Sequence, residues 1–302
     1  MNPPPTRCGQ VALVGAPNAG KSTLLNRLVG AKVAIVTAKV QTTRARITAI
    51  AMAGPVQLIF VDTPGIFAPK RRLERAMVQA AWRGAGEADQ VVLLVDAERG
   101  ADADTGRIVA GLDAAGRPAI LALNKIDRVA KPKLLELARE LEGQARFSHT
   151  FMISALTGDG VDDLQARLAD LMPAGPWLYP EDQLADVAER VLAAEITREK
   201  IFERLHQELP YSITVETESW TEQRDGALRI EQVIYVTRSG HKGIVLGHRG
   251  ATVKAIGAAA RAELAEIHGR PVHLFLFVKV RENWLDDPER YREMGLEFPS
   301  DS

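Results

Sequence analysis

The chain lacks the features that define several classes of protein. Its 302 residues include one cysteine, Cys8, which excludes any disulfide within the chain and fits a reducing compartment. The longest apolar runs, such as residues 91–95, have the length of a strand and fall far short of the ~20 residues that cross a bilayer. The opening Met-Asn-Pro-Pro-Pro-Thr has no apolar core of the kind found in signal peptides. We therefore expect a cytoplasmic protein.

The composition is that of an ordinary globular protein. Hydrophobic residues make up 46% of the chain and charged residues 25%, with a net charge of −1. The length suggests two domains, each large enough to bury its own core. Three prolines and one glycine among residues 172–180 forbid a continuous helix and predict the boundary. The predicted division is a flexible N-terminus at 1–9, a first domain at 10–172, a linker at 173–183, a second domain at 184–285 and a tail at 286–302.

In the first half, apolar runs of strand length alternate with segments of helical length. This alternation predicts an α/β domain with a mostly parallel sheet and helices on both faces. Residues 46–53 precede the next run with only Gly54 and Pro55 between them, which predicts an antiparallel hairpin. The apolar runs predicted as strands are residues 10–14, 56–61, 91–95, 119–123 and 151–153.

A phosphate-binding loop follows the first predicted strand. Residues 15–22, Gly-Ala-Pro-Asn-Ala-Gly-Lys-Ser, match G-x-x-x-x-G-K-[ST] between a strand and a helix. In such a P-loop, successive N–H groups turn toward the phosphates and the helix N-terminus adds a favourable dipole. We expect Lys21 to bridge the β- and γ-phosphates and Ser22 to ligate Mg²⁺. Alone, the motif could also be a glycine turn that caps a helix. The predicted nucleotide contacts of the loop are Gly15, Ala16, Pro17, Asn18, Ala19, Gly20, Lys21, Ser22 and Thr23.

A second motif, Asp62-Thr63-Pro64-Gly65, follows the run that ends at residue 61. Asp62 is expected to hold Mg²⁺ through water, and the N–H of Gly65 to contact the γ-phosphate. By itself the tetrapeptide is an ordinary turn. Its place after a predicted strand makes it the second acidic element of a nucleotide site, with Thr63 and Pro64 as further contacts.

The third motif, Asn124-Lys125-Ile126-Asp127, selects the base. A carboxylate at Asp127 can accept both N1–H and N2–H of guanine, and adenine offers neither donor. Sites that rely on such pairing reject the wrong ligand by roughly 10⁴–10⁵. Ser154, Ala155 and Leu156 follow the last predicted strand, and the Ala155 N–H is expected near guanine O6. Together the motifs predict a P-loop GTPase domain that binds GTP or GDP with Mg²⁺.

Residues 32–45 contain no acidic side chain and include Gln-Thr-Thr-Arg at 41–44. A threonine of this segment is expected to contact Mg²⁺ and the γ-phosphate. We favour Thr43, and Thr42 stays open. Ile66 stands where Ras-like GTPases carry a water-orienting glutamine, so intrinsic hydrolysis should be slow and depend on help from elsewhere.

The second half has a different pattern. A long helix is predicted at 184–209, then two strands that begin near residues 211 and 228. A glycine-punctuated stretch at 239–250 follows, with a helical flank at 245–246, and then a helix at 251–268 and a strand at 272–280. The order α-β-β-α-α-β, with a G-x-x-G turn between its last two helices, matches a type II KH domain. The predicted fold is therefore an α/β P-loop GTPase domain followed by a smaller α+β type II KH domain.

Two tetrapeptides could form the glycine turn, Gly240-His-Lys-Gly243 and Gly247-His-Arg-Gly250. We choose the second, because residues 245–246 and 251–253 have the pattern of helix flanks. Such a turn clamps the backbone of about four single-stranded nucleotides, although alone the tetrapeptide is most often a plain turn.

The charges of the second half support a phosphate-binding surface. Residues 176–302 hold 16 Lys and Arg against 22 Asp and Glu, yet residues 238–261 hold five basic residues and no acid. A basic strip in an acidic domain indicates a localised site for phosphates. The alternative is a solvated helix face. The predicted RNA contacts are Lys242, Gly247, His248, Arg249, Gly250 and Lys254.

From about residue 10 to residue 296, these motifs together resemble the Era family of bacterial GTPases. The resemblance implies a GTP-dependent switch that binds the 3′ region of 16S rRNA and acts in 30S ribosomal subunit assembly and rRNA maturation. It also implies some association with the inner membrane, and we expect a monomer. The pair His248-Arg249 departs from the family's commonest loop residues, which leaves the base preference open. The segments that carry the resemblance are residues 41–44, 176–180, 195–200, 210–212 and 278–284.

Asn18 offers a route to hydrolysis without a glutamine. In several related GTPases an asparagine at this position helps hold a monovalent cation, and K⁺ would place positive charge between the β- and γ-phosphates. The alternative is that Asn18 only shapes the loop through its own backbone hydrogen bonds. The residues predicted to serve catalysis are Lys21, Thr43, Gly65 and Asn18.

A different class of function fits part of the pattern. The chain could be a GTPase that regulates a protein or membrane partner, with the second domain as an interaction module. The basic strip around residues 247–250 favours the RNA-binding function.

Overall fold

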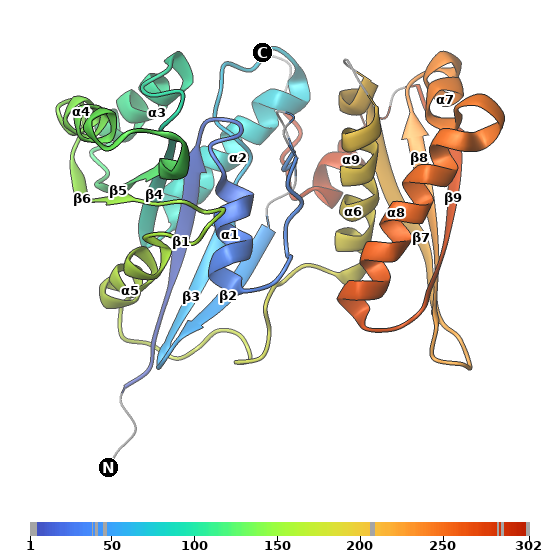
Figure 1. Cartoon of the computed structure of the whole chain (residues 1–302), viewed down its shortest axis with the longest axis horizontal. Coiled ribbons are helices and arrows are strands. Elements are labelled where there is room, and N and C mark those ends of the chain that lie inside the picture. Colours follow the sequence, from blue (N-terminus) through green and yellow to red (C-terminus); the bar gives the residue numbers. More distant parts are fainter. Residues whose placement is uncertain are drawn as a thin grey trace. The chain divides into compact units, whose positions relative to one another are not determined.

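The structure is a computed structural model that describes residues 5–37, 39, 42–44, 47–205, 209–282, 284 and 287–299. Gln41, Arg46, Asn283 and the predicted boundary at 285–286 lie outside this set. The chain forms two compact units (Figure 1). The first unit comprises residues 1–34, 43–186 and 291–302, and the second unit comprises residues 35–42 and 187–290.

The first unit is built on a six-stranded sheet in the order β2-β3-β1-β4-β5-β6 (Figure 1). All neighbours pair in parallel except β2 and β3, which form the predicted antiparallel hairpin. The predicted α/β fold is confirmed. The strands are β1 Arg7–Gly15, β2 Ile47–Ala53, β3 Val56–Asp62, β4 Gln90–Asp96, β5 Ala119–Asn124 and β6 Phe147–Met152; the helices are α1 Lys21–Val29, α2 Arg72–Glu87, α3 Ala103–Ala114, α4 Lys131–Glu142 and α5 Val161–Leu171.

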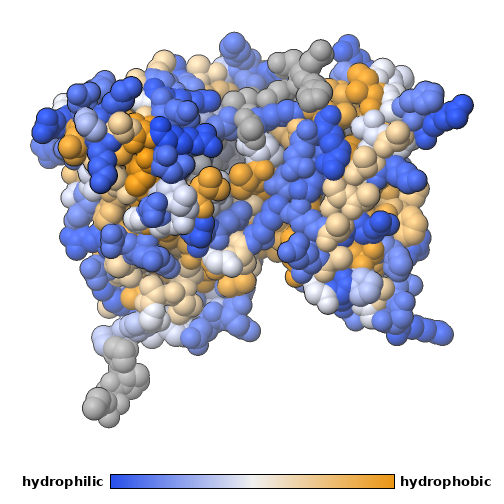
Figure 2. Space-filling view, viewed as in Figure 1, coloured by the Kyte–Doolittle hydropathy of each residue, from blue (hydrophilic) through white to orange (hydrophobic). Residues whose placement is uncertain are grey.

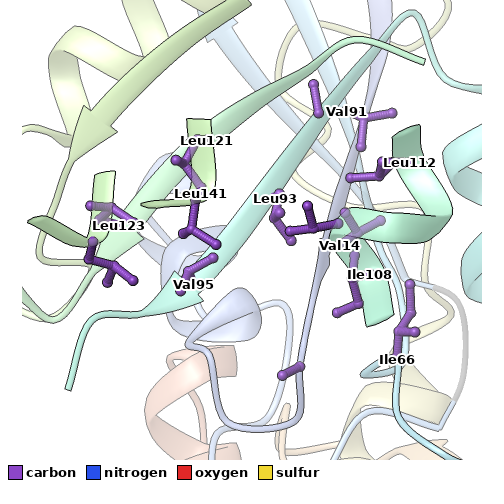
Figure 3. Packing of buried hydrophobic residues seen from close by; sticks show 14 of the residues in the cluster. Val14, Ile66, Val91, Leu93, Val95, Ile108, Leu112, Leu121, Leu123 and Leu141 are labelled. Carbon is purple, nitrogen blue, oxygen red and sulfur yellow. The ribbon is translucent and has the colours of Figure 1, made fainter. Parts of the chain in front are cut away.

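The central strands are apolar on both faces because helices cover both. Helices α1 and α5 contact each other and β2 and β3 on one face. On the other face, residues of α2, α3 and α4 pack around Leu93, Val95 and Leu121 (Figure 3). Continuous apolar runs are typical of parallel strands enclosed in this way.

The three nucleotide motifs lie at one edge of this sheet. Gly15 ends β1, Asp62 ends β3 and Asn124 ends β5. Because these strands run parallel, their carboxyl ends meet at the same edge, which is where open α/β sheets bind ligands. The fold therefore gathers motifs that are far apart in the sequence.

The helix predicted at 184–209 is shorter in the structure, where α6 spans Glu189–Arg204. The prediction was wrong at both ends. Backbone groups of residues 184 and 186 pair with β2: the Ile50 N–H donates to Leu184 O at 2.8 Å, and the Asp186 N–H donates to Thr48 O at 2.9 Å. Backbone groups used at a sheet edge are not available to a helix, so α6 begins later. At its other end, Leu205 is extended.

Residues 173–186, called the strap below, belong to the first unit and are held against β3 by a buried glutamine. Gln57 on β3 is 0% exposed. Its Oε1 accepts the N–H groups of Leu178 at 2.9 Å and Tyr179 at 3.1 Å, and its Nε2 donates to Tyr179 O at 2.8 Å. The Trp177 indole N–H also donates to Pro55 O at 3.1 Å. These bonds satisfy backbone groups that proline-rich sequence leaves without a helix partner.

The end of the chain also belongs to the first unit, where it packs on α2. Tyr291 is buried, and its ring meets Phe298 edge-on at 4.9 Å. The guanidinium of Arg72 lies 5.0 Å from the centre of the Phe298 ring, and Arg83 pairs with Glu297 at 2.6 Å. Both arginines belong to α2, the helix that follows the Asp62–Gly65 motif.

The second unit has a three-stranded sheet in the order β7-β8-β9, with β7 and β8 antiparallel and β8 and β9 parallel. Residues of α6, α7 and α8 join these strands in its apolar core. The order α-β-β-α-α-β confirms the predicted KH fold. The elements are α6, the 3₁₀ turn Leu209–Ser212, β7 Ile213–Glu222, β8 Leu228–Val236, α7 Ser239–Leu246, the 3₁₀ turn His248–Gly250, α8 Ala251–His268, β9 Val272–Val280 and, at the junction with the tail, α9 Pro288–Glu293.

Within the described ranges, no helix combines the length and the apolar character needed to cross a bilayer. On the face drawn in Figure 2, hydrophobic residues lie in scattered groups among hydrophilic ones.

We predict that Gln57→Ala lowers the free energy of unfolding by about 2–4 kcal/mol, because it removes three hydrogen bonds that hold the backbone of Leu178 and Tyr179. Urea unfolding measures the change. Gln79→Ala, at an exposed position of α2, is the control and should change stability by less than about 0.5 kcal/mol. Limited proteolysis should also cut the strap faster in the Gln57 variant. Equal stability of the two variants would contradict this account of the strap.

Candidate nucleotide site and glycine loop

The turn from β1 to α1 leaves no room for side chains at two of its glycines. A Cβ at Gly15 would lie 2.5 Å from Leu94 O, and one at Gly20 would lie 2.2 Å from Asn124 Nδ2. Asn18 has a left-handed backbone, with φ of 66°. The loop therefore needs its glycines for close backbone packing as well as for its turns.

Lys21 is buried beneath this loop. Its Nζ donates to Gly15 O and to Ala16 O, each at 3.0 Å. Burial lowers the pKa of Lys21 to about 8, and the charge of Asp62 opposes that shift. An anionic ligand near Nζ would raise the pKa again and favour the charged form. The ammonium is thus placed where a phosphate would stabilise it.

Three oxygen-bearing side chains meet at the foot of the loop. Ser22 Oγ donates to Asp62 Oδ2 at 2.9 Å, and Thr43 Oγ1 lies 3.0 Å from Ser22 Oγ and 3.3 Å from Asp62 Oδ2. Asp62 is 0% exposed, and its Oδ1 has no hydrogen-bond partner among the residues that the structure describes. Burial raises the pKa of Asp62, while Lys21, Ser22, Thr43 and the Thr63 backbone oppose the shift.

This oxygen set fits Mg²⁺, a hard cation that is commonly held by one or two carboxylates together with substrate phosphates. The buried Oδ1 of Asp62, which has no hydrogen-bond partner in the described part of the chain, is a ligand atom of the right kind. In the described part of the chain, no group of three or more His, Cys, Asp and Glu side chains offers a metal site made of protein ligands alone.

The structure distinguishes the two candidate threonines by their contacts. Thr43 joins Ser22 and Asp62. The Thr42 hydroxyl instead bonds to Thr37 Oγ1 at 2.7 Å and donates to Lys39 O at 2.8 Å. Geometry therefore favours Thr43 as the metal ligand.

Gly65 and Ile66 pack directly on the P-loop. A Cβ at Gly65 would lie 2.9 Å from Pro17 N, and the Ile66 N–H donates to Gly15 O at 3.1 Å. The Ile66 side chain is buried in the same apolar cluster as Val14 and Ile108 (Figure 3). Its side chain faces the core and has no polar group with which to orient water.

Asn124 joins the P-loop to the lid at residues 154–156. It is buried, its Nδ2 donates to Ala19 O at 2.8 Å, and its Oδ1 accepts the Ala155 N–H at 2.9 Å. The Ala155 N–H that was expected near guanine O6 thus has a protein partner here, and its role toward the base stays a prediction. Leu156 is exposed.

The carboxylate of Asp127 is oriented by the same lid. Its Oδ1 accepts a hydrogen bond from Ser154 Oγ at 2.7 Å. Lys125 has a left-handed backbone, with φ of 67°, and its Nζ lies 2.5 Å from Asp96 Oδ2. These bonds fix the loop that carries Asp127 from two sides.

Two residues of this site were missed in the sequence. Asp96 ends β4 at the same sheet edge as the motifs, and its position after an apolar run was an available signal. Arg27 of α1 donates from Nε to Ala155 O at 3.4 Å and from its terminal nitrogen to Leu156 O. No local pattern relates Arg27 to a lid more than 120 residues away.

In the second unit, the turn between α7 and α8 is Gly247–Gly250, whereas residues 240–243 lie inside α7. Gly247, Arg249 and Gly250 have φ values of 71°, 51° and 79°. A Cβ at Gly247 would lie 2.1 Å from Thr252 Oγ1 and 2.9 Å from Thr252 N. The structure thus confirms the chosen tetrapeptide as the interhelical turn, and only glycine fits at its start.

Cationic side chains surround this turn. His248, Arg249 and Lys254 are exposed, and Lys242 is half-buried on α7. His241 accepts a hydrogen bond from Arg238 Nε at 2.7 Å, and partial burial and Arg238 lower its pKa, so it adds no charge at neutral pH. The positive potential of the strip comes from its lysines and arginines.

Comparison with known families gives two matches along the chain. A family described as 50S ribosome-binding GTPase matches residues 10–125. A KH domain family matches residues 208–285. The two matches correspond to the site at the sheet edge and to the glycine turn.

Relatives match the chain over nearly its whole length. GTPase Era of Afipia carboxidovorans is 63% identical, over 98% of this chain and 96% of the relative. GTPase Era of Rhizobium meliloti is 61% identical, over 98% of this chain and 94% of the relative.

Two solved structures of Era share the fold. One is a variant of Aquifex aeolicus Era bound to GDP and AlF4⁻, with a TM-score of 0.91 at 38% identity, over 96% of this chain and 99% of that chain. The other is Era in complex with MgGDPNP and nucleotides 1506–1542 of 16S ribosomal RNA, with the same TM-score, identity and coverage. Near-complete coverage, the nucleotide motifs and the KH domain together show that this chain belongs to the Era family and is a GTPase.

Proposed function

We propose that this chain is a GTP-dependent switch that binds the 3′ region of 16S rRNA and acts in 30S subunit assembly and rRNA maturation. One observation carries the proposal: a GTP site and an exposed, cationic G-x-x-G turn occur in one chain. A structure similar over 96% of this chain was solved with MgGDPNP and nucleotides 1506–1542 of 16S rRNA.

In the proposed site, Ser22, Thr43 and Asp62 hold Mg²⁺, and Lys21 binds the β- and γ-phosphates. Bound Mg²⁺ neutralises charge on the phosphate oxygens. The N–H groups of the P-loop and of Gly65 face the phosphates, and the loop's tight packing on Leu94 and Asn124 fixes their positions. Preorganised donors of this kind stabilise charge that develops during phosphoryl transfer.

Guanine selection rests on Asp127. Ser154 donates a hydrogen bond to Oδ1 of this carboxylate, so Oδ2 is left for the base. Arg128 Nε lies 3.8 Å from that second oxygen. A carboxylate so placed accepts the two adjacent donors of guanine and leaves adenine unpaired.

Hydrolysis needs a group that orients water or adds positive charge at the phosphates. Ile66 cannot supply such a group, because its side chain is apolar and is part of the core. We propose that K⁺ held by Asn18 supplies positive charge against the phosphates. The left-handed backbone of Asn18 supports a special role for that residue in the loop. Loop shaping alone is the competing explanation.

In the second unit, the turn at Gly247–Gly250 is proposed to grip the RNA backbone. Its exposed Arg249 and Lys254, with Lys242 on the preceding helix, supply the charge. Among the residues that the structure describes, no comparable feature favours regulation of a protein partner. Association with the inner membrane rests on family resemblance alone and stays a prediction.

We predict that Asp127→Asn shifts the preference from guanosine to xanthosine triphosphate, because the amide offers a donor to the altered base edge. GTP affinity should fall by about 100-fold or more. Equilibrium binding of the two nucleotides measures the change. Asp163→Asn, at an exposed position of α5, is the matched control and should bind GTP as the unaltered protein does. Unchanged GTP affinity in Asp127→Asn would remove the proposed base contact.

The double variant His248→Asp with Arg249→Asp should abolish binding to an RNA of the 16S 3′ region and leave GTP binding intact, because the turn acts by positive potential and close approach. A filter-binding or anisotropy assay at several salt concentrations measures the affinity, which should fall as salt rises. The matched control is His273→Asp with Arg224→Asp, both exposed in the same unit. If only the control pair weakened binding, RNA recognition would lie elsewhere on the domain.

Hydrolysis should be faster in K⁺ than in Na⁺ at equal ionic strength, and Asn18→Ala should erase the difference while keeping GTP affinity. The gain is bounded by the roughly 10³–10⁵ that a finger arginine gives. Single-turnover rates in the two salts measure it. Equal rates in the unaltered protein would disprove the role of K⁺ and leave activation to the bound RNA or ribosomal particle.

A further inference from the structure

The chain passes through the second unit just before Thr43, the threonine proposed to contact Mg²⁺. Residues 35–42 belong to the second unit, although residue 34 and residue 43 both belong to the first. Ile35 is buried in an apolar cluster with Ala193 and Ile196 of α6 and with Leu264 of α8. A segment of the nucleotide-binding half is thus built into the core of the KH half.

Glu199 of α6 holds the start of this segment. It is 2% exposed, and its Oε1 accepts the Val36 N–H at 2.7 Å. Its Oε2 pairs with Lys200 Nζ at 3.0 Å, and Lys200 also pairs with Glu263 of α8 at 2.7 Å. The bond to Val36 is charge-assisted and shielded from water, so it is stronger than an exposed one.

Arg198 holds the end of the segment. It is 1% exposed, and its guanidinium donates to Glu195, with Nε to Oε1 at 2.8 Å, and to Thr42 O. The same group lies 5.2 Å from the centre of the Phe202 ring. Its Nη1 finds no acceptor among the described residues. The cation is therefore compensated by one carboxylate and by the carbonyl of Thr42.

Burying the charges of Arg198 and Glu199 costs free energy, so stabilising α6 does not by itself explain their burial. A buried charge with an unpaired nitrogen is often less stable than a well-packed apolar side chain of similar volume. Arg198 and Glu199 lie in the segment Glu195–Lys200, one of those that carry the family resemblance, and the GTP and RNA sites described above give them no role. The contact that they share is with residues 35–42.

The Thr42 carbonyl and the Thr43 N–H belong to one planar peptide unit. A hydrogen bond that fixes the carbonyl oxygen therefore also fixes the orientation of the bond leading to Thr43 Cα. Thr43 in turn places its hydroxyl against Ser22 and Asp62. Arg198 thus holds the peptide that leads directly to Thr43.

We propose that Arg198 and Glu199 are positioning residues for triphosphate recognition. They touch no nucleotide; they anchor residues 35–42 on α6 and thereby hold Thr43 where it meets Mg²⁺ and the γ-phosphate. The inference rests on the proposed role of Thr43. It makes the first helix of the KH domain part of the machinery that distinguishes GTP from GDP.

The test is the ratio of GTP to GDP affinity in Mg²⁺ for the full-length chain. Arg198→Met should lower GTP affinity by about tenfold or more, since hydrogen bonds to buried charges are of that strength, and should change GDP affinity by less than about twofold. Thr43→Ala should give a loss of similar size. In the double variant the two losses should not add, because both act through the Thr43 hydroxyl.

Three further variants separate positioning from a general loss of structure. Arg198→Lys retains the positive charge and can still donate hydrogen bonds, so it should recover part of the GTP affinity. Glu199→Gln retains an acceptor for the Val36 N–H and should be milder than Glu199→Leu. Arg190→Met, at an exposed position of α6, is the matched control and should leave the GTP to GDP ratio unchanged.

The outcomes distinguish this inference from the proposed function. If Thr43→Ala lowers the ratio and neither Arg198→Met nor Glu199→Leu does, the positioning role is wrong and the role of Thr43 stands. If Arg198→Met weakens GTP and GDP equally, the residue is structural and the inference fails. If Thr43→Ala leaves the ratio unchanged, the proposed metal contact fails, and the inference fails with it.

Discussion

The buried carboxylate of Asp62 organises the nucleotide site. Its charge lies where no water reaches it, and its partners Lys21, Ser22 and Thr43 come from the P-loop, from the start of α1 and from the segment before β2. Removing a carboxylate from water costs several kcal/mol unless cations and donors surround it. The separate segments are therefore drawn to one point at the sheet edge, and one oxygen stays available for a cation.

Thr43 and Gly65 belong to the two segments that would contact the γ-phosphate. Each segment is close to a point where the chain passes to or from the second unit. Residues 35–42, just before Thr43, are part of that unit. Helix α2 follows Gly65, and its Arg72 and Arg83 contact the end of the chain. That end belongs to the first unit and follows the KH domain in the sequence. The strap at 173–186 is the remaining connection, and Gln57 holds it to the sheet.

Local patterns made much of this predictable. The P-loop, the hairpin at Gly54 and the bounds of α8 follow from spacing, turn residues and periodicity, which act over a few residues. The features that were missed depend on bonds between distant residues. The early start assigned to α6 fails because Leu184 pairs with Ile50, and the contacts of Arg27 reach across more than 120 residues. Apolar spacing in 184–188 has no information about an edge strand that competes for the same backbone groups.

Two buried charges of opposite sign hold the consecutive residues Thr42 and Thr43. In one unit the Asp62 carboxylate accepts from the Thr43 hydroxyl, and in the other the Arg198 guanidinium donates to the Thr42 carbonyl. Each charge keeps one atom without a hydrogen bond among the described residues, Oδ1 of Asp62 and Nη1 of Arg198. A metal ion at Asp62 would compete with the Thr43 hydrogen bond and turn that hydroxyl into a ligand. If Arg198 is a positioning residue, as proposed, a change at the nucleotide that moves Thr43 would also act on the bond between Thr42 and Arg198 of α6.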